Sequence, residues 1–403
     1  MKRRMMKLVS LLCVTAMTMS LLAGCGGAEE TGTDNTSAEE SVESETEVVS
    51  EIEEEVEEEA DVETEADTVS EGEVAAGSEA IIKAAATDGK VGNWGLGNEY
   101  EILALLAKYD LPTEYLSQDF TMDGFDDDSV TLASAMTYNE LGLVQNDYDG
   151  GYAYGDSIGI IDMNDEGVAM LEDNIFCTKQ FAEENPNTVA AFLYASLKGW
   201  EYAVANPAEA AEICYEYGSS VSPEHQAYMA SEVAKLVTTD TTGNAVSVVG
   251  NMDDTAMQQT LDIAKQYVTL DDPDANAALQ AITLDDIRDT SFFEAAKASD
   301  GTFDVEKSEV SIQLKWLPQA QFMGYYVALD KGYYDEVGLK VNIVSGGGDI
   351  AETTAVNNGT VDFGVTWVTN LASANAGGMD LVEIAQIYQR SGLVLVYKPE
   401  NFQ

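Results

Sequence analysis

The spacing of apolar residues predicts strands that alternate with helices from about residue 90 onward. A strand near Lys90 leads through a glycine-rich turn into a helix from Asn98, where apolar residues recur at helical spacing. The segment 131–144 is predicted to be a buried run of small residues that enters another helix. Two further strands are predicted at 158–162 and 167–177.

The middle of the chain is predicted to be almost entirely helical. Its helices are expected at 187–205, 207–217, 223–237, 253–267 and 284–298. Pro207 and Pro223 stand where proline is favoured, in the first turn of a helix. The polar stretch 299–309 has no apolar pattern and is predicted to be a linker.

From Val310 onward the alternation of strands and helices returns. Strands are expected at 310–316, 339–344, 361–367, 380–389 and 393–398, and helices at 321–332, 349–358 and 370–378. Strands that alternate with helices are typical of an α/β protein with parallel sheets.

Residues 1–25 have the pattern of an export signal. Four positive charges precede an apolar run that is too short for a comfortable membrane span. The run ends in LAGC, which resembles a bacterial lipobox and implies cleavage before Cys25 and lipid attachment to it. Several acyl chains would anchor the protein to the outer face of the cytoplasmic membrane. The alternative is an ordinary signal with an incidental cysteine.

Residues 26–80 are predicted to be a disordered acidic tether. The stretch 28–80 contains 22 acidic residues and neither lysine nor arginine. Such a composition cannot bury enough apolar surface to fold, and charge repulsion extends it. An acidic tail that binds a partner is the alternative.

The formal net charge of -54 argues against nucleic acid as a partner, because phosphate binding needs clustered lysine and arginine. Only four arginines are present, which disfavours di- and triphosphates as ligands. The single histidine, His225, leaves no His-rich metal site, so we expect no metal. Cys177 and Cys214 are expected to be buried free thiols, with a disulfide between them as the alternative.

Three stretches of the late part carry a family resemblance. They read KWLPQAQFMGYYVALDKGYYDEVGL, GTVDFGVTW and QIYQRSG, and they resemble the first half of solute-binding proteins of the thiamine-pyrimidine type. The stretch from KVGNWGLGNEYEI to NPAEAAEI resembles the second half of the same family. The family contains ABC-transporter receptors for thiamine-pyrimidine precursors, related sulfonate and riboflavin binders, and fungal pyrimidine synthases.

The resemblance covers about residues 88–403 and implies a type II periplasmic-binding-protein-like fold, with two Rossmann-like α/β lobes, a hinge and a ligand cleft. The two halves stand in reverse order, so the chain is predicted to be a circular permutant. Lobe 2 is expected at 88–180, a helical segment returning to lobe 1 at 181–298, a linker at 299–309 and lobe 1 at 310–403. A fragment of a tandem duplication is the alternative.

Ligands of such folds lie beyond the carboxyl ends of the strands, and twelve candidate residues stand there. They are Trp316, Gln321, Tyr325, Trp367, Asn370 and Gln389 in the late half, and Trp94, Asn98, Glu99, Tyr138, Asn139 and Glu140 in the early half. The aromatic rings would stack on a flat heterocycle, and amides and carboxylates would read its edge. Core packing of the aromatic residues and helix capping by Asn98 and Glu99 are the alternatives.

The resemblance implies a binding protein rather than an enzyme. The synthases use a histidine after the Trp-Pro turn and a cysteine cluster, where this chain has Phe322 and GVAML at 167–171. We therefore expect no catalytic residue and no cofactor, and a monomer that delivers an aromatic heterocycle to an ABC permease. A thiamine pyrimidine precursor, such as hydroxymethyl- or formylamino-pyrimidine, is the first expectation, and riboflavin or a sulfonate is the next. A sensor or adhesion module is a further alternative.

Overall fold

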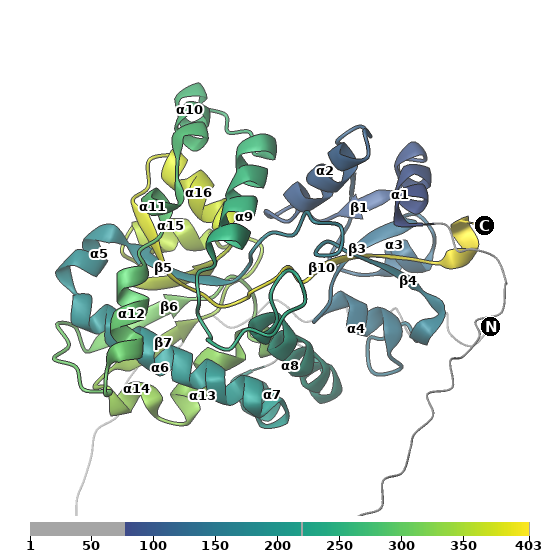
Figure 1. Cartoon of the computed structure of the whole chain (residues 1–403). Helices are drawn as coiled ribbons and strands as arrows, with labels where there is room; N and C mark the ends of the chain where they lie inside the picture. The colour runs from purple at the N-terminus through teal and green to yellow at the C-terminus, as the bar shows by residue number, and fades with distance from the viewer. Residues whose placement is uncertain (1–76, 219–220, 403) are drawn as a thin grey trace, which may run out of the picture. The chain divides into compact units, whose positions relative to one another are not determined.

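The computed structural model describes residues 77–218 and 221–402 (Figure 1). The predicted export signal with its lipidation site Cys25 lies outside these described residues, and so does most of the predicted tether 26–80.

Helix α1 (Ser78–Thr87) is the first element of the described chain. It buries Ile81, Ile82 and Ala85 against the rest of the fold. The predicted boundary of the tether at residue 80 is therefore corrected, because folded structure begins slightly earlier.

Two five-stranded sheets form the centres of the two lobes. The lobe 2 sheet has the order β2-β1-β3-β10-β4 and consists of β1 (Val91–Asn93), β2 (Leu116–Ser117), β3 (Leu132–Met136), β4 (Gly159–Asp162) and β10 (Leu393–Tyr397). The lobe 1 sheet has the order β7-β6-β8-β5-β9 and consists of β5 (Asn174–Thr178), β6 (Glu309–Gln313), β7 (Lys340–Val344), β8 (Phe363–Thr366) and β9 (Leu381–Gln386). The predicted two-lobed α/β fold is confirmed (Figure 1).

Each sheet contains one strand from the other half of the chain. β10 lies antiparallel between β3 and β4, where Leu395 pairs with Ser134 on one side and Ile161 on the other. β5 lies antiparallel between β8 and β9. The expectation of parallel sheets is therefore right for β1 to β3 and β6 to β8 and wrong for the two inserted strands. The predicted lobe 2 segment 88–180 thus ends in a strand of lobe 1, and the predicted lobe 1 segment 310–403 includes a strand of lobe 2.

Helices flank both sheets. In the early part they are α2 (Glu99–Lys108), α3 (Asp123–Asp126), α4 (Glu140–Gln145) and the short 3-10 turn η2 (Gly155–Ser157). The middle part contributes α5 (Lys179–Glu184), α6 (Pro186–Ala205), α7 (Pro207–Glu216), α8 (Pro223–Thr238), α9 (Asp254–Tyr267), α10 (Pro273–Ala281), α11 (Leu284–Ile287) and α12 (Thr290–Ala298). The late part contributes η3 (Ala320–Phe322), α13 (Met323–Asp330), α14 (Tyr333–Glu336), α15 (Glu352–Asn357), α16 (Val368–Ala376) and η4 (Pro399–Phe402).

Side chains at the helix starts explain several of these boundaries. Ser222 accepts a hydrogen bond from the backbone N–H of His225 at 3.2 Å, and Pro223 occupies the first turn of α8. Asp253 accepts one from the backbone N–H of Ala256 at 2.9 Å at the start of α9. Both are N-cap residues that satisfy donors left free in the first helical turn.

The predicted single helix 284–298 is wrong, because the structure divides it into α11 and α12. Between them Arg288 forms an isolated bridge with Glu383 of β9, and the Asp289 N–H donates to the Glu383 carbonyl at 2.9 Å. The backbone thus leaves the helix to pair with the edge of the lobe 1 sheet. The predicted strand 167–177 is also shortened, since β5 begins at Asn174.

Cys177 and Cys214 are buried free thiols in the structure, in agreement with the sequence expectation. Over residues 77–218 and 221–402, none of the helices has the length and apolar character needed to cross a membrane. Within the same ranges, no group of three His, Cys, Asp or Glu side chains is arranged to hold a metal ion.

Two glycines allow α6 and α13 to pack very closely beside the lobe 1 sheet. A Cβ on Gly199 would lie 2.2 Å from the Gly324 carbonyl oxygen, and one on Gly324 would lie 2.1 Å from Cδ2 of Trp200. Trp200 itself is buried and packs edge-on against Tyr325, with ring centroids 5.5 Å apart. Neither helix can accommodate a larger residue at this crossing without moving away from its partner.

We predict that Gly199→Ala lowers the free energy of unfolding by about 1–3 kcal/mol, because the added methyl group has no space at the α6–α13 crossing. Gly77→Ala is the matched control, since a Cβ there meets no atom within 4 Å. Urea unfolding followed by tryptophan fluorescence measures both changes. Equal midpoints for the two variants would contradict the packing described above.

Candidate functional site

A cavity of about 560 Å³ lies between the two lobes. The lobe 2 wall comes from segments 94–100 and 136–140, which follow β1 and β3. The lobe 1 wall comes from segments that follow β6, β7 and β8, and it includes Trp316, Gly348 and Trp367. These are carboxyl ends of strands, which is where open α/β sheets hold their ligands.

The structure brings ten of the twelve predicted residues together around this cavity. They are Trp94, Asn98, Glu99, Tyr138, Asn139, Glu140, Trp316, Gln321, Trp367 and Asn370. The other two lie elsewhere. Tyr325 is buried in the core against Trp200, and the Gln389 amide donates to the backbone carbonyls of Asn251 and Gln386. Neither residue lines the cavity.

The lobe 2 wall carries two buried polar atoms that have no hydrogen-bond partner in the described protein. They are the indole Nε1 of Trp94 and the amide Oδ1 of Asn98, which is only 4% exposed. Asn98 precedes α2, but its side chain makes no capping bond there. The helix-capping alternative is therefore not realised for Asn98, and a buried acceptor without a partner requires a donor from a ligand or from water.

Two carboxyl groups of the lobe 2 wall, those of Glu99 and Glu140, accept hydrogen bonds from neighbouring residues. The Glu99 carboxylate accepts the Gly97 N–H at 2.7 Å. The Glu140 carboxyl accepts the Met136 N–H at 3.0 Å through Oε2 and the Asn139 amide at 2.7 Å through Oε1. Burial raises the pKa of Glu140 to about 7, although these hydrogen bonds act in the opposite direction. Glu140 thus exchanges its proton near neutral pH at the edge of the cavity.

Asp173, which the sequence analysis did not identify, fixes the lobe 1 wall. Its Oδ1 accepts the Trp367 indole N–H at 3.0 Å, and its Oδ2 accepts the Gln321 amide at 2.8 Å. The residue has φ +37 and lies immediately before β5, where the chain passes from lobe 2 to lobe 1. Burial raises the pKa of Asp173 to about 6. One carboxyl in the crossing segment therefore orients two cavity side chains.

An ion pair lines the same wall and was also missed. Lys315 Nζ lies 3.2 Å from Glu352 Oε1 and 4.6 Å from the ring centroid of Trp367. The Thr366 hydroxyl donates to the same Glu352 oxygen at 2.5 Å. Lys315 is the one basic side chain among the residues that line this cavity, whereas three of the lining residues are glutamates. The partners are 37 residues apart in sequence, so no local pattern announces them.

Phe120 lines the cavity from the lobe 2 side. Its ring is 54% exposed and lies 5.2 Å from the Trp316 ring of lobe 1, at an interplanar angle of 55°. Phe120 follows the two-residue strand β2 in an irregular loop, where the sequence pattern carries no signal. The contact is an aromatic pair formed between the lobes.

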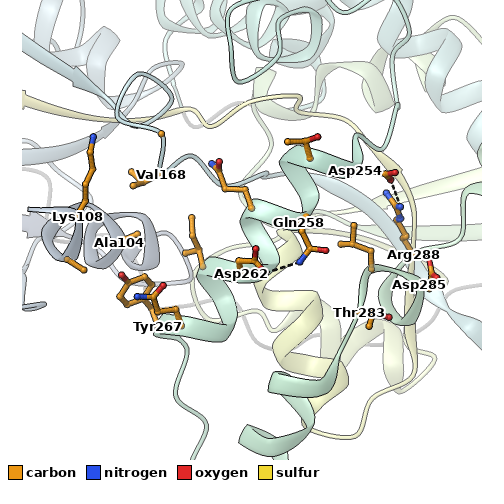
Figure 2. A pocket seen from close by; sticks show the side chains of 17 residues that line it. Ala104, Lys108, Val168, Asp254, Gln258, Asp262, Tyr267, Thr283, Asp285 and Arg288 are labelled. Atoms are coloured by element: carbon orange, nitrogen blue, oxygen red, sulfur yellow. Dashed lines mark hydrogen bonds and ion pairs between the residues drawn. The ribbon is translucent and has the colours of Figure 1, made fainter.

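A larger cavity of about 1100 Å³ lies between α2, α9 and α11 (Figure 2). Several of its charged and amide side chains bind one another, as in the Arg288–Asp254 ion pair and the Gln258–Asp262 hydrogen bond at 2.8 Å (Figure 2). None of the unpartnered buried polar atoms of the described residues lines it. The smaller interlobe cavity, with its tryptophans and free acceptor, is therefore the candidate ligand site.

The family model described as NMT1/THI5 like matches residues 67–210 and 319–402. The chain belongs to this family. Members of the NMT1/THI5-like family are mostly binding proteins, and membership is consistent with a protein that binds a small solute. The lobe 2 wall falls within the first matched segment, whereas Trp316 stands just before the second. No curated protein matches the chain.

Buried carboxyl groups make the stability of the folded protein depend on pH. Burial raises the pKa of Glu101 and Glu383 to about 8 and that of Glu140 to about 7. The pKa values of these carboxyl groups are higher in the folded protein than in the unfolded chain, where they are about 4. The folded protein therefore holds protons which the unfolded chain releases. Their stabilising effect is complete in acid and is lost as pH rises through 7 to 8. We expect the melting temperature to fall by several degrees between about pH 5 and about pH 9.

Glu140→Gln should remove the part of this slope that ends near pH 7, whereas exposed Glu183→Gln should leave the slope unchanged. Differential scanning calorimetry over the pH series makes the comparison. Carboxyls whose pKa is lowered, such as Asp128 beside Lys398, act only below this window. A melting temperature that rises from pH 5 to pH 9 would contradict the assignment of protonated buried carboxyls.

Proposed function

We propose that this chain is the extracytoplasmic substrate-binding lipoprotein of an ABC importer, and that it binds a flat, amino-substituted aromatic heterocycle between its lobes. A thiamine pyrimidine precursor is the leading ligand. The observation that carries the proposal is the pairing of aromatic faces on lobe 1 with a buried, unpartnered acceptor on lobe 2, Asn98 Oδ1. Aromatic faces favour a planar ring, and the acceptor favours an N–H on its edge.

The charges of the cavity support a ligand that donates hydrogen bonds. Glu99, Glu140 and Glu352 line it, against one basic residue, Lys315, which is already paired with Glu352. A sulfonate would need cations that are free to receive it, so this branch of the family is disfavoured. Phe322, at the position where the resemblance expects the synthase histidine, is fully buried in the core, which supports binding without chemistry.

The proposed mechanism is closure around the ligand. The lobes are joined by two crossing segments, one before β5 and one before β10. A ligand that contacts both walls stabilises the closed form relative to the open one by its differential affinity. In this proposal lipid on Cys25 holds the monomer at the outer face of the cytoplasmic membrane, the acidic tether gives it reach, and the closed form docks on the permease.

We also propose that the two halves form a circular permutant of the family order. Both lobes share one strand arrangement, in which the first four strands of each half surround a strand from the other half. The linker joins α12 to β6. Its residue Glu306 holds it to α6 by accepting the Thr188 N–H at 2.9 Å. Lys90 donates to the Asp128 carbonyl and Lys398 to the Asp128 carboxylate, so the segments before β1 and after β10 lie at the same end of the lobe 2 sheet, on either side of β3. Segments that lie near one another at the surface are what a permutation requires.

A thermal-shift screen of the chain against aminopyrimidines, flavins, sulfonates and nitrate tests the function. We expect an aminopyrimidine to raise the melting temperature, because a ligand that binds only the folded state stabilises it. Stabilisation by the sulfonates alone would contradict the ligand assignment.

We predict that Trp316→Ala weakens binding of the stabilising ligand about tenfold without unfolding the protein, because it removes a stacking face that lines the cavity. Glu99→Gln should also weaken binding by removing a charge that attracts N–H donors. Tyr215→Ala is the matched control, since this exposed aromatic residue of α7 lies outside the cavity. Isothermal titration calorimetry measures the affinities. If Trp316→Ala and Glu99→Gln both bind the ligand with the affinity of the parent, the site assignment is wrong.

A further inference from the structure

The start of α8 reaches both walls of the interlobe cavity from behind. His225 is 1% exposed and contacts Asn139 of the lobe 2 wall, and the next residue, Gln226, accepts the Ala320 N–H at 2.8 Å beside the lobe 1 wall. α8 otherwise packs on α6 and α7 and on η3, which carries Gln321. Two consecutive residues of one helix are thus bonded to both halves of the site.

The contact of α8 with lobe 2 is closely fitted. Tyr228, one turn after His225, stacks on its ring at an interplanar angle of 6° and donates to the Thr137 carbonyl at 2.8 Å. A Cβ on Gly142 of α4 would lie 2.3 Å from the Tyr228 ring, so a glycine is needed where α4 meets α8. Tyr228 is therefore packed against α4, and its ring lies parallel to the His225 ring.

A chain of hydrogen bonds leads from His225 to the cavity. The Asn139 amide nitrogen donates to Glu140 Oε1 at 2.7 Å, so the amide oxygen faces His225 Nε2 at 2.8 Å. An amide oxygen only accepts, which requires the proton on Nε2. Nδ1 is then an acceptor, and the Tyr148 hydroxyl at 2.6 Å donates to it. All donors in this chain point toward the Glu140 carboxylate.

We propose that His225, the single histidine of the chain, is a positioning residue for ligand recognition, which orients the Asn139 amide and through it the Glu140 carboxylate. This inference rests on the proposed function, because Glu140 is one of the groups assigned to the ligand. Without the Nε2–H the Asn139 amide loses the partner that defines its orientation, and Glu140 loses a donor.

The electrostatic setting agrees with a neutral ring. Burial lowers the pKa of His225 to about 4, and the groups that face it are the Tyr148 hydroxyl, the Asn139 amide and the Tyr228 ring. The histidine therefore keeps one tautomer over the whole range in which Glu140 titrates. It acts as a fixed donor rather than as a pH switch.

The tautomer can be measured directly, because a tag-free chain has one histidine and gives one set of imidazole signals. We expect ¹⁵N NMR of the ligand-free protein to show the Nε2–H form from about pH 5 to about pH 9. A ring protonated at Nδ1 or a mixture of tautomers would overturn the proposal. This measurement needs no ligand and therefore stands even if the proposed function fails.

Two substitutions separate the roles of the ring nitrogens. His225→Gln retains a donor near the position of Nε2, whereas His225→Asn retains only a group near Nδ1. Calorimetric titration with the hydroxymethyl aminopyrimidine precursor of thiamine should give an affinity about tenfold lower for His225→Asn and within about twofold of the parent for His225→Gln. Ser231→Ala, on the exposed side of α8, is the control.

The outcomes of these measurements distinguish the two claims. If the parent binds the pyrimidine and the His225→Gln and His225→Asn variants have equal affinities, the positioning role is overturned and the proposed function is left intact. Absence of binding by the parent overturns the proposed ligand, and the tautomer measurement then decides the hydrogen-bond chain alone. Loss of affinity in the Asn variant, with rescue by Gln, supports both.

Discussion

Strand β10 follows the lobe 1 strands β6 to β9 in sequence, but it is buried in lobe 2, between β3 and β4. The rest of the structure depends on this exchange of strands between the lobes. Leu393, Val394, Leu395 and Val396 are all almost completely buried there. β5 makes the reciprocal insertion into lobe 1. Neither sheet is continuous without the other half of the chain, so the lobes stay connected through two antiparallel strands, and the ligand cavity opens between them.

Polar groups in the crossing segments transmit this constraint to the cavity. Asp173 holds Trp367 and Gln321 from the point at which the chain enters lobe 1. Glu172, its neighbour, accepts the Gly392 N–H in the other crossing segment at 3.3 Å. The side chains that would meet a ligand are therefore positioned by the same residues that join the lobes. In such an arrangement, the proposed closure and the proposed ligand binding would be coupled by direct contacts rather than by a long path.

The sequence predicted the α/β alternation, and ten of the twelve residues chosen at strand ends line one cavity, because helical spacing and strand ends are local signals. It failed where partners distant in sequence decide the outcome. The helix break at Arg288 depends on pairing with Glu383, and the Lys315–Glu352 ion pair joins the segment after β6 to the start of α15. Tyr325 is predicted at the cavity because it follows a strand in sequence, but it lies in α13 and packs edge-on against Trp200, a contact between residues 125 positions apart.

We propose that one ligand contacts the lobe 1 wall and the lobe 2 wall at once. Hydrogen–deuterium exchange, with and without the ligand that stabilises the protein most, tests it directly. We expect slower exchange in 94–100 and 136–140 of lobe 2 and also in 315–321 and 367–374 of lobe 1. Protection confined to one lobe, or protection along the groove between α2 and α9 instead, would contradict it.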